Sequence, residues 1–147
     1  KDGKCPRGGE GCGVCSNLEG NFEIIEETNK DGIKDTSCLL ASGAKNVYWL
    51  KTLKSHNLEG FETFMSTIPK DTLIICESNS LRKVVRPGIF IMMNNSPNNT
   101  IKETASEVID KADIIIDYDF RNDIDTIIEK LEIKKVQTGL EVKNICS

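Results

Sequence analysis

The sequence has no excess of positive charge and no long hydrophobic run. Its 147 residues carry 19 Lys and Arg against 23 Asp and Glu, which gives a formal net charge of -4. That balance removes the long-range attraction that binders of nucleic acid or anionic membranes normally use. The longest apolar runs, such as residues 89–93, fall far short of the roughly 20 residues that a membrane span needs. We therefore expect no nucleic-acid and no membrane partner.

A signal peptide and a phosphate-binding loop are also lacking. The chain opens at Lys1 without a basic stretch and a following apolar segment, so no retained signal peptide is expected. Three of the six cysteines crowd into residues 5–15, unlike a disulfide framework, which indicates a reducing, cytoplasmic compartment. The pattern G-x-x-x-x-G-K-S/T does not occur, and the glycine-rich residues 8–13 lack both the lysine and the preceding strand.

Composition divides the chain into three parts. Residues 1–20 are rich in glycine and show no hydrophobic periodicity, which predicts a loop. Residues 21–132 alternate short apolar runs with helical periodicity, and residues 133–147 have no clear pattern and stay unassigned. The expected strands are residues 22–28, 47–50, 72–76, 89–93 and 113–117, and the expected helices are residues 35–44, 58–65, 101–112 and 124–131.

Several of the expected strands are apolar on both faces and are separated by amphipathic helices. This pattern is typical of an open α/β fold, with a mainly parallel sheet and helices packed on both of its faces. Ligands of such sheets bind beyond the carboxyl ends of the strands. The residues that follow each apolar run are therefore the first candidates for a site.

Polar residues follow two of these runs. Glu77 comes directly after residues 72–76, where a carboxylate could hold Mg²⁺ or orient a water near a phosphate, or could instead cap the following helix. Asn94, Asn95 and Asn98 follow residues 89–93, and their amides could bind a purine edge or simply form a turn. Both alternatives stay open at each place.

The cysteines near the start have the spacing of a partial metal site. Cys5, Cys12 and Cys15 form C-x6-C-x2-C, and the Cys12–Cys15 pair is half of a common zinc or iron–sulfur site. The fourth ligand could be Cys38, His56 or a cysteine of a second subunit, and a redox or disulfide pair is the other chemical alternative.

Three further features are expected to be structural or solvated. Cys38 and Cys76 are expected to be small core residues. The basic group Arg82, Lys83 and Arg86 could meet a phosphate or an acidic ligand, although charges on a loop are more often solvated.

The order of several short motifs resembles the molybdopterin-guanine dinucleotide biosynthesis protein B (MobB) family and its P-loop NTPase relatives. Asp35-Thr36, then residues 41–44 and the strand 46–50, resemble one stretch of that family. The run 73–76 leading into Glu77 resembles its "E-G" strand end, with Ser78 in place of the usual glycine. Lys102 and residues 105–113 fit its later helix and "A-D" strand start.

This resemblance implies a dimeric nucleotide-binding domain that uses GTP with Mg²⁺ and assists molybdenum-cofactor maturation, with a maturation protein or a molybdenum enzyme as partner. Asp35 and Glu77 would act as catalytic residues near Mg²⁺ and the γ-phosphate, and residues 94–99 would lie near the base. The family's Walker A strand, loop and helix would precede residue 1. We therefore expect a fragment with an unfilled strand position in its sheet; the alternative is a metal-binding accessory protein that uses the cysteine cluster.

Overall fold

The computed structural model describes residues 18–93, 102–116 and 124–145, and these residues form a mixed α/β structure. The chain divides into two compact units, with the boundary between Thr67 and Ile68. Within the described residues no helix is long and apolar enough to cross a membrane.

The first unit contains an antiparallel strand pair. β1 (Phe22–Glu26) pairs with β2 (Tyr48–Thr52) so that Phe22 lies opposite Thr52. On one face of the pair, Lys51 Nζ lies 3.3 Å from a Glu23 carboxylate oxygen and 4.5 Å from the centroid of the Trp49 ring. Both β1 and β2 were expected from the sequence. Their antiparallel pairing, however, departs from the expected parallel sheet.

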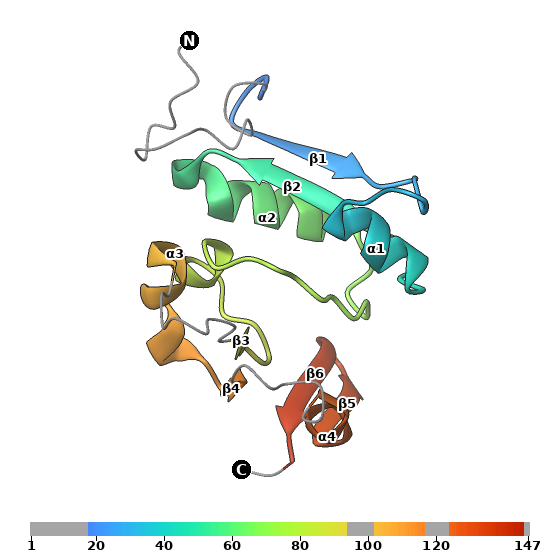
Figure 1. The fold of residues 1–147 in the computed structure, drawn as a ribbon, viewed down its shortest axis with the longest axis vertical. Helices are drawn as coiled ribbons and strands as arrows, with labels where there is room; N and C mark the ends of the chain where they lie inside the picture. Colours follow the sequence, from blue (N-terminus) through green and yellow to red (C-terminus); the bar gives the residue numbers. More distant parts are fainter. Residues whose placement is uncertain (1–17, 94–101, 117–123, 146–147) are drawn as a thin grey trace. The chain divides into compact units, whose positions relative to one another are not determined.

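The long helix of this unit packs against the strand pair through a glycine. α2 (Asn57–Thr67) follows the short 3-10 helix η1 (Lys54–His56), and Figure 1 shows it running along the two strands. Gly60 is buried: a Cβ placed on it would lie 2.9 Å from Thr52 Cγ2 and 3.2 Å from Phe22 Cβ. The Phe64 ring meets that of Tyr48 at 5.3 Å between centroids. The remaining helix of the unit is α1 (Asp35–Ala41).

The second unit holds the one parallel strand pair of the described residues. β3 (Ile91–Met93) pairs with β4 (Ile114–Ile116), which joins Ile91 to Ile114 and Met93 to Ile116. Met92, Ala105 and Val108 form the small core beneath them. Parallel pairing requires a crossover between the strands, and the crossover contains α3 (Glu103–Ser106) and η3 (Ile109–Lys111).

The expected helix over residues 101–112 is thus broken into two short turns. The break falls at Val108, whose φ of -136° and ψ of 0° are not helical. Its side chain is fully buried in the core. The sequence periodicity predicts a continuous helix here. The backbone instead leaves the helical conformation at Val108, where the side chain is buried in the core.

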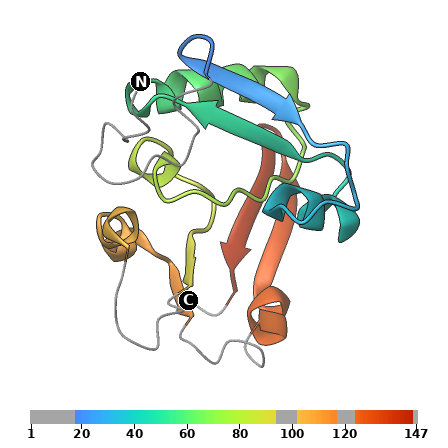
Figure 2. The same ribbon diagram turned by 45° about the horizontal axis from the view of Figure 1, so that its top comes forward.

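The unassigned tail contains a β-hairpin. α4 (Ile124–Glu129) is followed by β5 (Leu131–Val136) and β6 (Gly139–Asn144), which pair antiparallel and which Figure 2 shows side by side. Glu132 lies opposite Lys143, and Lys134 lies opposite Glu141. The ion pairs themselves run along each strand, from Lys134 to Glu132 at 2.9 Å and from Lys143 to Glu141 at 3.1 Å, so all four charges gather on one face of the hairpin.

The expectation of one open, mainly parallel sheet was wrong for the described residues. They form three two-stranded sheets, of which only β3–β4 is parallel. Residues 72–76 form no strand, and Ile75 is 86% exposed. The apolar run predicts a buried strand, but a strand needs a neighbour for its backbone N–H and C=O groups, and the described residues provide none.

Candidate functional site

The edge where ligands were expected is formed by the ends of two parallel strands. Met93 and Ile116 are paired, so β3 and β4 end at the same edge. The segments that leave this edge, which include Asn94, Asn95 and Asn98, lie outside the described residues. Their assignment to a nucleotide base therefore stays a prediction that rests on the position of the strand ends.

Glu77 lies on an exposed segment before the 3-10 helix η2 (Leu81–Lys83). Its carboxylate has no hydrogen bond or ion pair with another described residue. The N-cap residue is Ser80, and the Ser78 Oγ accepts the backbone N–H of Leu81 at 3.2 Å and lies 3.3 Å from Ser80 Oγ. The Glu77 carboxylate therefore does not cap this helix, and it remains open to a ligand.

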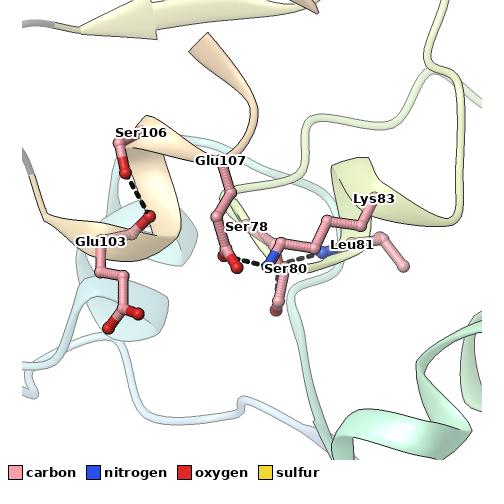
Figure 3. Close-up of polar contacts among 7 residues, drawn as sticks. All are labelled: Ser78, Ser80, Leu81, Lys83, Glu103, Ser106 and Glu107. Atoms are coloured by element: carbon pink, nitrogen blue, oxygen red, sulfur yellow. Dashed lines mark hydrogen bonds and ion pairs between the residues drawn. The ribbon is translucent and has the colours of Figure 1, made fainter.

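An ion pair joins η2 to the crossover between β3 and β4. Lys83 Nζ donates to the Glu107 carboxylate just after α3, as Figure 3 shows. Within α3, Ser106 Oγ donates to the Glu103 carbonyl at 2.7 Å. Of the three basic residues noted in the sequence, Lys83 thus has a carboxylate partner within its own unit.

Asp35 begins α1 and is exposed, in the first unit, whereas Glu77 belongs to the second. Lys34 occupies the N-cap position, so neither Asp35 nor Thr36 caps the helix. The Thr36 hydroxyl donates instead to Glu27 Oε2 at 2.8 Å. The structure therefore does not bring the two predicted catalytic carboxylates together within one unit.

Glu27 is a polar centre that sequence reasoning missed. The Asn29 N–H donates to Glu27 Oε1 at 2.9 Å. The hydrogen bond from this N–H and the one from the Thr36 hydroxyl hold the pKa of the Glu27 carboxyl below its usual value. The sequence gives only a weak signal for this contact. Glu27 and Thr36 are nine residues apart, and they meet only because the turn at residues 29–32 reverses the chain.

The described residues contain no group of three or more His, Cys, Asp or Glu side chains arranged to hold a metal ion. Cys5, Cys12 and Cys15 lie outside these residues, so the predicted cysteine site stays a prediction. Cys38 and Cys76 were expected in the core, but both are exposed. The cause for Cys76 is that its segment forms no strand.

The Cys76 thiol is nevertheless perturbed. Partial enclosure of the sulfur raises its pKa, and the adjacent Glu77 carboxylate raises the pKa further. At neutral pH the group is therefore a protonated thiol and a poor nucleophile or metal ligand.

A polar pocket of about 360 Å³ lies at the other edge of the parallel pair. Gly88 precedes β3 and Asp113 precedes β4, so this is the amino-terminal edge of both strands. The sequence indicated two of its basic residues but not the acidic ones, which come from η3 and the turn after it. The pocket is lined by Arg82, Arg86, Pro87, Gly88, Asp110, Lys111, Ala112 and Asp113.

No protein-family model, curated protein or solved structure matches this chain.

Proposed function

We propose that this chain is the greater part of a guanine-nucleotide-binding domain that assists molybdenum-cofactor maturation, and that its phosphate loop is carried by a segment outside these 147 residues. The proposal starts from the resemblance of its motifs to the MobB family. The observation that carries it is that β3 and residues 73–77 each have backbone groups unpaired within the described part of the second unit, which we assign to a missing strand.

The first unpaired groups lie at the edge of β3 that faces away from β4. Within the described residues β3 is hydrogen-bonded to β4 alone; Gly88, which precedes β3, lies against Val142 of β6, where an added Cβ would be 3.4 Å from Val142 Cβ, without strand pairing. The edge strand of an open sheet presents a row of unpaired N–H and C=O groups, which is a template for pairing with another strand. An edge of this kind is suited to accept a further strand.

The second unpaired groups belong to the apolar run before Glu77. Leu73 and Ile75 are 49% and 86% exposed. No backbone hydrogen bond joins residues 73–77 to another described residue. Residues with this side-chain composition favour a strand, and their exposure is unfavourable by roughly 1.5–3 kcal/mol for each large apolar side chain that could have been buried. A further strand beside this run would pair its backbone groups.

A parallel strand beside β3 supplies what nucleotide binding requires. Its carboxyl end would lie at the same edge as Met93 and Ile116, where a glycine-rich loop could present backbone N–H groups to phosphates. Glu77 directly follows the apolar run 73–76, and we assign it to Mg²⁺ or to the attacking water. Asn94, Asn95 and Asn98 would contact the guanine base.

The test uses the longest natural polypeptide that contains this sequence. We expect it to carry G-x-x-x-x-G-K-S/T within about 30 residues before Lys1, the span of a strand–loop–helix unit. It should bind GTP in the presence of Mg²⁺, and Glu77→Gln should weaken the Mg²⁺-dependent part of binding about tenfold.

The matched control is Glu129→Gln, which removes an exposed carboxylate at the end of α4. It should leave GTP binding unchanged. An upstream sequence without the motif, or a polypeptide that carries the motif but does not bind GTP, would contradict the proposal.

A further inference from the structure

We propose that the pocket at the amino-terminal edge of β3 and β4 binds a small oxyanion, a phosphate or a carboxylate group. This site is distinct from the nucleotide site proposed above, which lies at the carboxyl edge of the same strands. It does not rest on the resemblance, because its residues belong to η2, η3 and the turns that enter the two strands.

The guanidinium of Arg82 is held in a fixed position at the base of the pocket. Its Nη1 donates to the Val85 carbonyl at 3.3 Å, and its Nη2 donates to the Lys111 carbonyl at 3.4 Å. The group also lies 5.4 Å from the centroid of the Phe90 ring. Each Nη carries two N–H groups, so each keeps one donor beyond these bonds. Fixing a guanidinium before a ligand arrives lowers the entropic cost of binding.

Two more cations line the same pocket. Arg86 and Lys111 are exposed, and neither forms an ion pair with another residue of the described part. Asp113 is already engaged, since its Oδ2 accepts the Phe90 N–H at 2.7 Å. Guanidinium and ammonium groups are the usual partners of phosphate and carboxylate oxygens.

The charges of the lining residues favour an anion. Three cations face two carboxylates, a net charge of about +1 in a chain whose net charge is -4. Asp110 is the exposed carboxylate that opposes anion binding. The pocket volume of about 360 Å³ lies at the small end of ligand sites, which suits a small metabolite rather than a dinucleotide.

The test is a calorimetric titration of this chain with inorganic phosphate and, separately, with malonate. Both titrations detect an oxyanion site, and the ratio of the two dissociation constants shows whether the site prefers phosphate or carboxylate. We expect binding in the millimolar range to at least one of them. Arg86→Gln and Lys111→Gln should each weaken binding about tenfold, since each removes one charge-assisted contact.

Two further variants separate a binding role from a structural one. Asp110→Asn should strengthen binding severalfold, because it removes a repulsive carboxylate without removing a cation. Lys143→Gln removes a cation from the β5–β6 hairpin, outside the pocket lining, and should leave binding unchanged. The thermal unfolding midpoint of each variant is measured as well, and binding is compared only among variants whose midpoint equals that of the natural chain. Absence of binding to both anions, or binding that is the same in Arg86→Gln and Lys111→Gln as in the natural chain, overturns the proposal.

The outcome is independent of the nucleotide site. A protein that binds GTP but neither anion retains the proposed function and loses this site. One that binds phosphate without GTP shows the reverse.

Discussion

Met93 and Ile116 are paired at the carboxyl ends of two parallel strands, so two segments that are distant in the sequence leave the sheet from neighbouring positions. In an open α/β fold this is the edge at which ligands bind. The candidate residues Asn94, Asn95 and Asn98 directly follow the first of these strands. The proposal for a nucleotide site rests on this relationship and on the missing strand that we assign beside β3.

The first prediction concerns the pH dependence that Glu27 confers. Its pKa is lowered in the folded protein, so its carboxylate stabilises the fold above the unfolded-state pKa, near 4.5, and this contribution is lost as the pH falls through the folded-state pKa. Glu27→Gln should therefore lower the thermal unfolding midpoint at pH 7, and the difference should shrink below pH 4.5 and vanish once the Glu27 carboxyl is protonated in the folded protein.

Glu62→Gln is the matched control, an exposed glutamate on α2. Its midpoint should follow that of the natural protein at every pH. A Glu27→Gln difference that stays constant from pH 7 to pH 3 would show that the two hydrogen bonds do not act through the carboxylate charge.

The second prediction concerns Gly139, at the start of β6. Its φ is 139°, and an added Cβ would lie 2.5 Å from the Lys70 carbonyl oxygen. Gly139→Ala combines backbone strain with a contact to backbone that cannot yield easily, so it should lower the free energy of unfolding by about 2–3 kcal/mol.

Gly43→Ala separates those two effects. Gly43 has a φ of 102°, and nothing lies within 4 Å of an added Cβ, so only strain of about 1 kcal/mol is expected. Urea unfolding of both variants measures the difference. Equal losses at the two positions would mean that the Lys70 contact has no energetic effect.

The third prediction is that Gly60→Ala destabilises the protein although it lies inside α2. Alanine favours a helix over glycine by about 1 kcal/mol. Here the new methyl group would meet Thr52 Cγ2 at 2.9 Å, and overpacking of this kind typically costs about 1–3 kcal/mol. The net change in urea unfolding should be a loss.

The double variant Gly60→Ala with Thr52→Ser tests the cause. Serine lacks Cγ2 but keeps the hydroxyl that donates to Asn57 Oδ1. It should recover part of the lost stability. If Gly60→Ala alone stabilises the protein, the close packing between α2 and β2 is not a constraint.

The fourth prediction concerns the cysteine-rich residues that precede the described part. If their spacing serves a metal, the purified protein should contain zinc or iron in a fixed ratio, and Cys12→Ser or Cys15→Ser should abolish it. Cys76→Ser is the control, because it removes a single thiol that is not a candidate ligand. Elemental analysis of anaerobically purified protein measures the ratio, and a metal-free natural protein would exclude the site.

Local sequence patterns predicted many of the elements but not how they pair. The helix α2 was expected because Leu58, Phe61 and Met65 fall at helical spacing, and it is present. The β5–β6 hairpin was missed although apolar and charged residues alternate in both strands, as Leu131-Glu132-Ile133-Lys134 and Leu140-Glu141-Val142-Lys143, a pattern typical of half-exposed strands. Pairing depends on contacts between distant residues, which periodicity does not carry.

The candidate site was predicted less completely for a related reason. Arg82 and Arg86 are visible in the sequence as a basic group, but Asp110 and Asp113 join them only through the fold of the crossover. The prediction that residues 72–76 form a buried strand treated an apolar run as sufficient. A strand also requires a neighbour for its backbone groups, and the described residues provide none.

The most direct test of the account is backbone hydrogen exchange at residues 73–76 and 91–93. It should be measured in this chain and in the longest natural polypeptide that contains it. We predict that residues 73–76 exchange at nearly the rate of an unstructured peptide in the 147-residue chain, and that both stretches become strongly protected when an additional strand pairs with them. Rapid exchange at residues 73–76 in both polypeptides would contradict the proposed strand position and, with it, the proposed nucleotide-binding domain.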